Sequence, residues 1–125
     1  MIFRIARHTT KLDLVTDFYI KILGLEKIGS FENHNDYDGI FIGIKNADWH
    51  LEFTVSKDIP VHHFDEDDIL VFYPKTQVEY DQIIDNIKKN DIKILEPKNP
   101  YWKENGILIQ DYDGYNVIIS HLKIQ

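Results

Sequence analysis

Residues 3–13, FRIARHTTKLD, and residues 69–79, ILVFYPKTQVE, decide the fold because they follow one pattern twice. In each stretch a short apolar run leads to a Thr-x-x-acid sequence, from Thr10 to Asp13 and from Thr76 to Glu79. This sequence is a capping box, in which the hydroxyl accepts from a helix N–H and the acid reaches back toward the helix start. The repetition therefore predicts two strand–helix units.

Each predicted helix is followed by further strand-like segments. The first helix has apolar residues at three- and four-residue spacing and stops at Gly24. The strand-like segments are 25–31, 39–44 and 49–55 in the first half, and 92–95, 106–110 and 115–122 in the second. This order predicts an α+β fold of two βαβββ modules, about 1–57 and 66–125, joined by a connector at 58–65.

Composition restricts the class of protein. The chain has 125 residues, no cysteine and a formal net charge of −7. We expect one domain, in a reducing compartment, with neither disulfides nor zinc–thiolate sites. The acidic balance argues against a nucleic-acid partner. No apolar run is long enough to span a bilayer, and the first residues do not resemble a signal peptide, so we expect a cytoplasmic protein without a membrane partner.

A group of short motifs resembles the vicinal oxygen chelate superfamily, which has the glyoxalase, bleomycin-resistance and extradiol-dioxygenase fold. The motifs are FY at 18–19, LGL at 23–25, LEFT at 51–54 and DYDGY at 111–115. A small glyoxalase-like branch is indicated by RIAR at 4–7, YDG at 37–39, HLEFT at 50–54, LVFY at 70–73 and NPYW at 99–102. The resemblance spans nearly the whole chain. It implies cupped mixed sheets with helices on the outer face, and a homodimer.

In enzymes of that superfamily, His and Glu from the first and last strands of each half hold a divalent metal. The matching positions here are Arg4, Glu52, Asp68 and Ile118. Arginine has no lone pair to offer, and isoleucine cannot coordinate. This departure from the ligands of the superfamily's enzymes therefore favours no metal at this position. An unconventional set of Glu52, His8, His50 and Asp68 is the alternative, and it would take Ni, Zn, Fe or Mn.

The candidate catalytic residues are Arg4 and Glu52. If both side chains face the cup, the guanidinium and the carboxylate can form two parallel hydrogen bonds in place of the metal–ligand bond. In a functional site, Arg4 would bind a ligand carboxylate or enolate and Glu52 would act as a base. The structural alternative is that the pair only fills a vestigial site.

Other side chains are candidates for ligand binding. His8 shares strand parity with Arg4, and His50 shares it with Glu52. Arg7 would point toward the helix, or into the cavity if a bulge shifts the strand. The remaining candidates are aromatic: Tyr73, Tyr101 and Trp102. The last two lie in a proline-bounded loop, where they would stack on a ligand or, alternatively, anchor the loop to the core.

Three functions follow from these features. The first is a glyoxalase/bleomycin-resistance-like protein that binds a small organic ligand in the sheet cavity without the usual metal. The second is a divalent-metal-dependent lyase, isomerase or dioxygenase. The third is a non-catalytic interaction module whose cup is closed by packing. The sequence contains no glycine-rich phosphate loop, no nucleophile elbow and no His-Glu-x-x-His helix.

Overall fold

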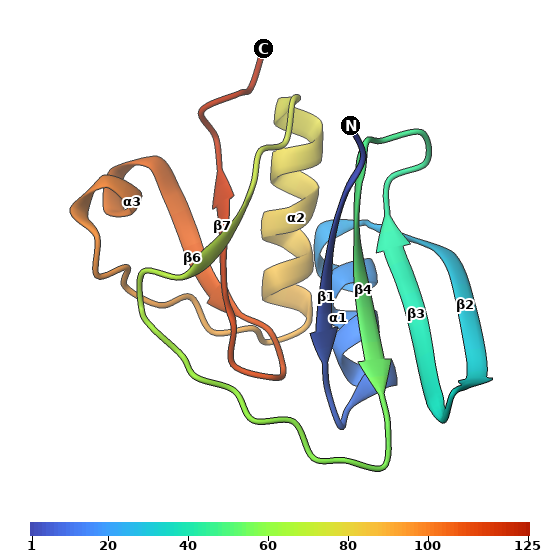
Figure 1. Cartoon of the computed structure of the whole chain (residues 1–125). Helices are drawn as coiled ribbons and strands as arrows, with labels where there is room; N and C mark the ends of the chain where they lie inside the picture. Colours follow the sequence, from blue (N-terminus) through green and yellow to red (C-terminus); the bar gives the residue numbers. More distant parts are fainter. The chain divides into compact units, whose positions relative to one another are not determined.

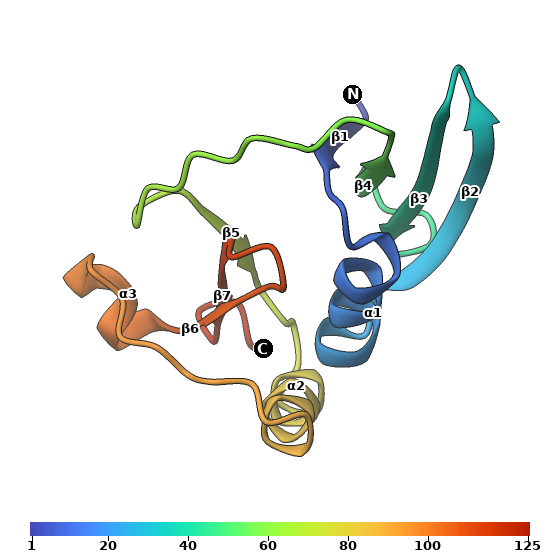
Figure 2. The ribbon, with the colours of Figure 1, turned by 90° about the horizontal axis from the view of Figure 1, so that it is seen from below.

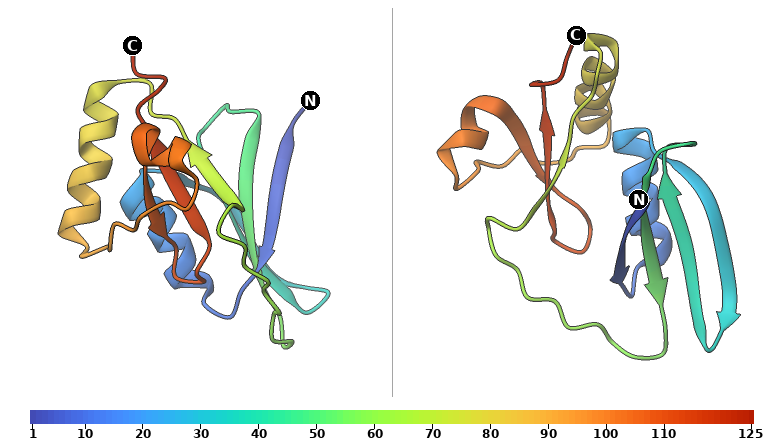
Figure 3. Two further views of the ribbon diagram at one scale, coloured as in Figure 1. Left: turned by 90° about the vertical axis from the view of Figure 1, so that its left-hand side faces the viewer. Right: turned by 45° about the horizontal axis from the view of Figure 1, so that its top comes forward.

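The computed structural model describes residues 1–125, and the chain forms two compact units, Met1–His62 and His63–Gln125 (Figure 1). The division falls within the connector expected at 58–65. The segment between the last strand of the first unit and the first strand of the second contains no helix or strand (Figure 3). No helix is long and apolar enough to cross a bilayer.

The first unit has the predicted βαβββ order. Its four strands lie in the sheet order β1-β4-β3-β2, with β1 parallel to β4 and the other neighbours antiparallel. One helix covers one face of this sheet (Figure 2). The elements are β1 (Phe3–His8), α1 (Leu12–Leu23), β2 (Glu26–His34), β3 (Tyr37–Gly43) and β4 (Trp49–Val55).

The core of the first unit lies between α1 and the sheet. The Tyr19 ring stacks on the Phe53 ring of β4, with centroids 5.3 Å apart, and Leu51 is buried as well. Since side chains alternate along a strand, His50 and Glu52 of β4 point to the opposite face. Each large side chain buried in this way contributes about 1.5–3 kcal/mol.

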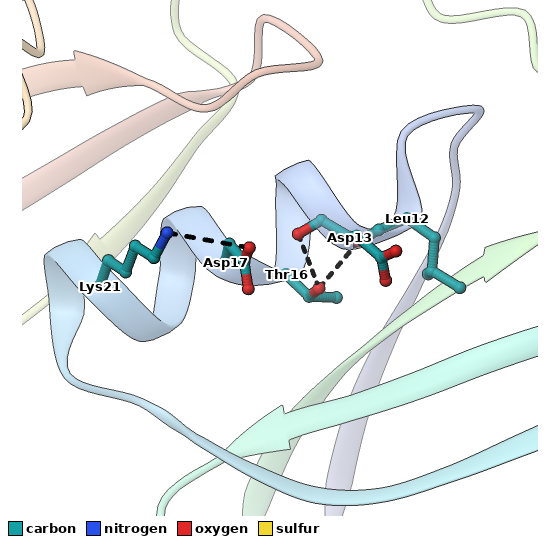
Figure 4. Close-up of polar contacts among 5 residues, drawn as sticks. All are labelled: Leu12, Asp13, Thr16, Asp17 and Lys21. Carbon is teal, nitrogen blue, oxygen red and sulfur yellow. Dashed lines mark hydrogen bonds and ion pairs between the residues drawn. The ribbon is translucent and has the colours of Figure 1, made fainter.

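Two side-chain contacts of α1 are made within the helix. The hydroxyl of Thr16, a nearly buried residue, donates to the Leu12 carbonyl at 2.8 Å and lies 3.1 Å from the Asp13 carbonyl (Figure 4). Lys21 and Asp17 form an exposed i,i+4 ion pair at 3.9 Å. The helix ends at Gly24, whose φ of 71° is the left-handed C-cap that the sequence predicted.

Only one of the two predicted capping boxes is present. Thr76 caps α2 (Gln77–Lys89) by accepting from the Glu79 N–H at 3.1 Å, and the Glu79 carboxylate reaches back to the Lys75 N–H at 2.9 Å. The box predicted at Thr10 is wrong. The N-cap residue of α1 is Lys11, which makes no side-chain cap, and the preceding turn is held by Thr9, whose hydroxyl accepts from the Lys11 N–H.

The second unit repeats the first with one strand fewer. Its strand order β5-β7-β6 corresponds to β1-β4-β3, again with one parallel and one antiparallel pair. The strand predicted at 92–95 is reduced to a single bridge between Leu95 and Leu108, and Pro97, which has no N–H, cannot extend the ladder beyond it. The elements, besides α2, are β5 (Ile69–Phe72), α3 (Pro100–Asn105), β6 (Gly106–Gln110) and β7 (Asn116–Ser120).

Candidate functional site

The face of the first sheet opposite α1 brings together side chains from β1, β2, β3 and β4. The strand register pairs Arg4 with His50 and places Phe41 directly opposite Glu52. Phe31 of β2 adjoins Phe41. We call these five residues the open-face patch. Strand parity placed His50 on the same face as Glu52, and the register adds Arg4 to that face; their role in a site stays a prediction.

The two charged side chains of the patch form an ion pair. Arg4 Nη1 lies 3.5 Å from Glu52 Oε2, and the side chains are 51% and 12% exposed, respectively. The separation exceeds the 2.7–3.2 Å of N–H···O hydrogen bonds, and only this one contact joins the pair. The two parallel hydrogen bonds expected between guanidinium and carboxylate are therefore not formed. Glu52 is a nearly buried carboxylate whose charge is balanced by one loose contact.

A row of aromatic rings begins beside this pair. The Arg4 guanidinium lies 5.8 Å from the centroid of the Phe41 ring. His50 and Phe31 flank the same ring, with centroids 5.6 and 5.8 Å away. A β-carbon at Gly39 would lie 2.4 Å from the Phe31 ring, so glycine is required there for the ring to lie on the sheet. The patch thus combines an apolar surface with a cation and an anion.

Phe31 and Phe41 were not among the predicted site residues, although the sequence carries a signal for Phe41. Ile40 and Ile42 flank Phe41 in β3, and Ile42 is fully buried on the helix side. Period-two alternation therefore places Phe41 on the face opposite α1. Phe31 had no such signal, because β2 contains register irregularities between Lys27 and Gly29 and again after Phe31.

His8 belongs to a different cluster from Glu52. Its Nε2 lies 2.9 Å from the Ser56 hydroxyl oxygen, and its ring centroid is 6.3 Å from that of Tyr37. The register pairs His8 with Thr54, two positions beyond Glu52. Arg7 lies on the helix side, with its Cζ atom 5.6 Å from the centroid of the Phe53 ring. This is one of the two orientations that the sequence left open.

The aromatic candidates lie in the second unit. Tyr73 is 41% exposed, with Lys123 Nζ 5.9 Å from its ring centroid. Tyr101 and Trp102 form an edge-to-face pair at 4.9 Å in α3, where Asn99 caps the helix. The predicted proline-bounded loop therefore contains a short helix, Pro100–Asn105. That these residues share a cavity with Arg4 and Glu52 stays a prediction.

The second unit has a small pocket beside Trp102. Apolar and charged residues line it together: Glu66, Asp67, Ile69, Pro97, Lys98, Asn99, Trp102, Leu108 and Ile118. The Trp102 ring also lies against Gly106, since a β-carbon there would be 3.4 Å from it. Packing within the unit accounts for the position of Trp102.

The residues at the superfamily's metal positions do not fit a divalent cation. Arg4 places a guanidinium next to Glu52, and Ile118 is an apolar side chain that is 1% exposed. Asp68 is exposed, and its N–H donates to the Asp65 carbonyl at 3.1 Å. No three His, Asp or Glu side chains are grouped so that they could hold a metal ion. The alternative set around Glu52, His8, His50 and Asp68 stays a prediction.

Family models match both halves of the chain. The YycE-like N-terminal domain matches residues 3–54, and the YycE-like C-terminal domain matches residues 67–121. The chain belongs to the YycE-like family. A YycE protein of Bacillus subtilis (strain 168) is 41% identical over 123 residues, which are 96% of this chain and 87% of the relative.

Solved structures agree with this assignment. The crystal structure of a YycE protein from Bacillus subtilis has a TM-score of 0.82 and 40% identity, over 95% of this chain and 88% of that one. Leishmania major glyoxalase I has a TM-score of 0.74 and 19% identity, over 98% of this chain and 87% of that one. The fosfomycin resistance protein FosX of Listeria monocytogenes has a TM-score of 0.67 and 16% identity, over 94% of this chain and 88% of that one. The last two share the fold, and the resemblance to the vicinal oxygen chelate superfamily is confirmed.

Proposed function

We propose that this chain binds a small organic molecule at the open-face patch, through Arg4 and Glu52, without the metal set of the superfamily's enzymes. The observation that carries the proposal is the single 3.5 Å contact between a half-exposed guanidinium and a nearly buried carboxylate. A buried charge is costly unless its hydrogen bonds are made. A ligand that bonds to both groups would supply them.

The surroundings of the pair support the same function. Small-molecule sites are mostly apolar and carry a few convergent polar groups that fix the ligand's orientation. Phe31, Phe41 and His50 provide such a surface next to Arg4 and Glu52. The FosX structure is a complex with Mn(II) and 1S,2S-dihydroxypropylphosphonic acid, so a protein of this fold holds a small organic ligand.

The alternative is a divalent-metal-dependent lyase, isomerase or dioxygenase centred on Glu52. It is favoured by the Mn(II) in FosX and opposed by the donor set of this chain. Arg4 would place a like charge beside the cation, and the attraction of Glu52 for the guanidinium would have to be broken first.

One experiment separates the two functions. Untagged protein is analysed for bound metal, and its melting temperature is then followed with Mn, Fe, Ni, Zn, a chelator and a small-molecule library. We expect no stoichiometric metal, and library compounds that raise the melting temperature; a ligand at 100 times its Kd stabilises by about 2.7 kcal/mol.

Matched variants assign the effect to the patch. For a compound that stabilises the wild type, Arg4→Gln and Glu52→Gln should each reduce the ligand-induced shift at the same ligand concentration. Lys21→Gln removes an exposed ion pair from α1 of the same unit and should leave the shift intact. About one equivalent of metal per chain that is lost in Glu52→Gln would overturn the proposal in favour of the enzyme.

A homodimer is the second part of the proposal. β1 lies at the edge of its sheet, so one side of its backbone is unpaired within that sheet. Phe3 of this strand and the adjoining Ile2 are 60% and 73% exposed. Exposed apolar edge strands favour association with another chain. Sedimentation velocity should show a dimer that Ile2→Glu weakens, and a wild-type monomer at high concentration would defeat this part.

A further inference from the structure

We infer that the ligand of the open-face patch has an uncharged head group that offers one hydrogen-bond acceptor and one donor side by side, on a flat apolar body. The chemical class is an aromatic carboxamide. This inference rests on the proposed function and deepens it.

The charges of the patch favour an uncharged head group. Arg4 and Glu52 carry one formal charge of each sign and lie 3.5 Å apart, so the pair already balances itself. An anionic head group next to Arg4 would lie close to the Glu52 carboxylate, and a cationic one next to Glu52 would lie close to Arg4. Like charges brought together in a partly desolvated site oppose binding. A neutral head group avoids both repulsions.

The hydrogen-bonding groups of the pair call for complementary partners on the ligand. The side chains of Arg4 and Glu52 make no hydrogen bond in the structure, and the contact between them is too long to be one. A guanidinium can only donate, and an ionised carboxylate can only accept. A carboxamide presents a carbonyl oxygen for Arg4 and an N–H for Glu52 in one planar group. Both bonds would be charge-assisted.

The flat body follows from the rings next to the pair. Phe41 lies below the Arg4 guanidinium and is flanked by Phe31 and His50, with centroid separations of 5.6–5.8 Å. These separations lie within the range of offset and edge-to-face aromatic contacts. An aromatic ring attached to the carboxamide would extend this row and cover apolar surface. A saturated ring of the same size would bury similar area without the ring–ring contacts.

Four probes of nearly equal size test the head group and the body separately: benzamide, benzoate, benzylamine and cyclohexanecarboxamide. Each is titrated into the full chain, and binding is followed by amide chemical shifts assigned to β1, β3 and β4. We expect benzamide to bind at least tenfold tighter than benzoate and benzylamine, and severalfold tighter than cyclohexanecarboxamide. Because benzamide carries no net charge, its Kd should change less than twofold between 50 and 500 mM salt.

Charge variants provide a reversal that a purely structural role of the pair would not produce. Glu52→Gln should weaken benzamide binding about tenfold and strengthen benzoate binding, because the repelling carboxylate is gone. Arg4→Gln should weaken benzamide binding and strengthen benzylamine binding. The conservative Glu52→Asp keeps the charge and should not reverse the preference, and Lys21→Gln should change nothing.

The outcomes separate this inference from the proposed function. Tighter binding of benzoate or benzylamine to the wild-type patch would overturn the carboxamide class and leave ligand binding standing. The same holds if no probe binds but a library compound of another class shifts the β1, β3 and β4 signals. If neither the probes nor the library shift these signals, both the inference and the proposed function fail.

Discussion

The Arg4 guanidinium lies 3.5 Å from the Glu52 carboxylate, yet Arg4 is half-exposed whereas Glu52 is only 12% exposed. The two residues are not register partners: Glu52 pairs with Ala6 across the parallel β1–β4 ladder, and Arg4 pairs with His50. Arg4 therefore reaches diagonally over the sheet to the carboxylate. The carboxylate depends on Arg4 more than Arg4 depends on the carboxylate, because the guanidinium has water as an alternative partner.

This asymmetry predicts a strong coupling in a double-mutant cycle. Arg4→Gln should destabilise the protein by about 1–2 kcal/mol, since it leaves Glu52 without its counter-charge. Removing one partner of a fully buried ion pair would cost more, about 3–5 kcal/mol. Glu52→Gln should cost less than about 1 kcal/mol, and the double variant should be close to Glu52→Gln alone. Urea unfolding monitored by circular dichroism measures all three. Additive effects of the two substitutions would show that the pair does not interact.

The two predicted capping boxes give a second, internally controlled prediction. Thr76→Ala removes the acceptor of the Glu79 N–H and should destabilise the protein by about 1 kcal/mol. Thr10→Ala removes a hydroxyl that caps no helix and should stay within about 0.5 kcal/mol of wild type. The same unfolding measurement serves both variants, and equal effects at the two positions would contradict the observed caps.

Sequence periodicity predicted most of the fold, because the repeated strand–helix pattern and the alternation of β4 are enforced by burial on one face. It failed where local backbone chemistry decides. At Thr10 the capping motif was present, but the hydroxyl of Thr9 holds the turn, and the helix starts after Lys11. Residues 92–95 have strand composition, but only Leu95 pairs, and Pro97 cannot extend the ladder beyond it.

The candidate site was predictable to the extent that it depends on strand parity. Alternation places His50 and Glu52 of β4 on one face, and the β1–β4 register, which the sequence did not supply, adds Arg4 to it. The partner of His8 was not predictable, because Ser56 lies beyond the end of β4 and its position depends on how the chain leaves the strand. The length of the Arg4–Glu52 contact could not be predicted from the sequence either, since side-chain geometry depends on the neighbouring rings.

Close packing at the start of β6 gives a third prediction. A β-carbon on Gly106 would lie 2.5 Å from Ile118 Cγ2 and 3.2 Å from the Ile119 carbonyl oxygen, so a rotation of Ile118 alone would not relieve the contact. Gly106→Ala should destabilise the protein by about 1–3 kcal/mol. It should also shift the fluorescence of Trp102, measured in a Trp49→Phe background, because that ring lies 3.4 Å from the same position. An unchanged spectrum would place Trp102 away from Gly106.

Tyr80 in α2 predicts a pH dependence of stability above pH 10. Burial raises the pKa of the Tyr80 hydroxyl above its ordinary 10.0, and the Asp81 carboxylate raises it further. Between the ordinary pKa and the raised one, the unfolded chain has lost the Tyr80 proton while the folded chain keeps it. The folded state then binds more protons, so its stability falls as the pH rises.

Below pH 10 both states keep the proton, and the contribution is fully present. Tyr80→Phe removes the titrating group, so the free energy of unfolding should fall less steeply between pH 9 and pH 11 than in wild type. Urea unfolding at intervals across this range measures both slopes, and the offset between the proteins at pH 8 corrects for the lost hydroxyl. Parallel slopes for the two proteins would show that Tyr80 ionises equally easily in the folded and unfolded chains.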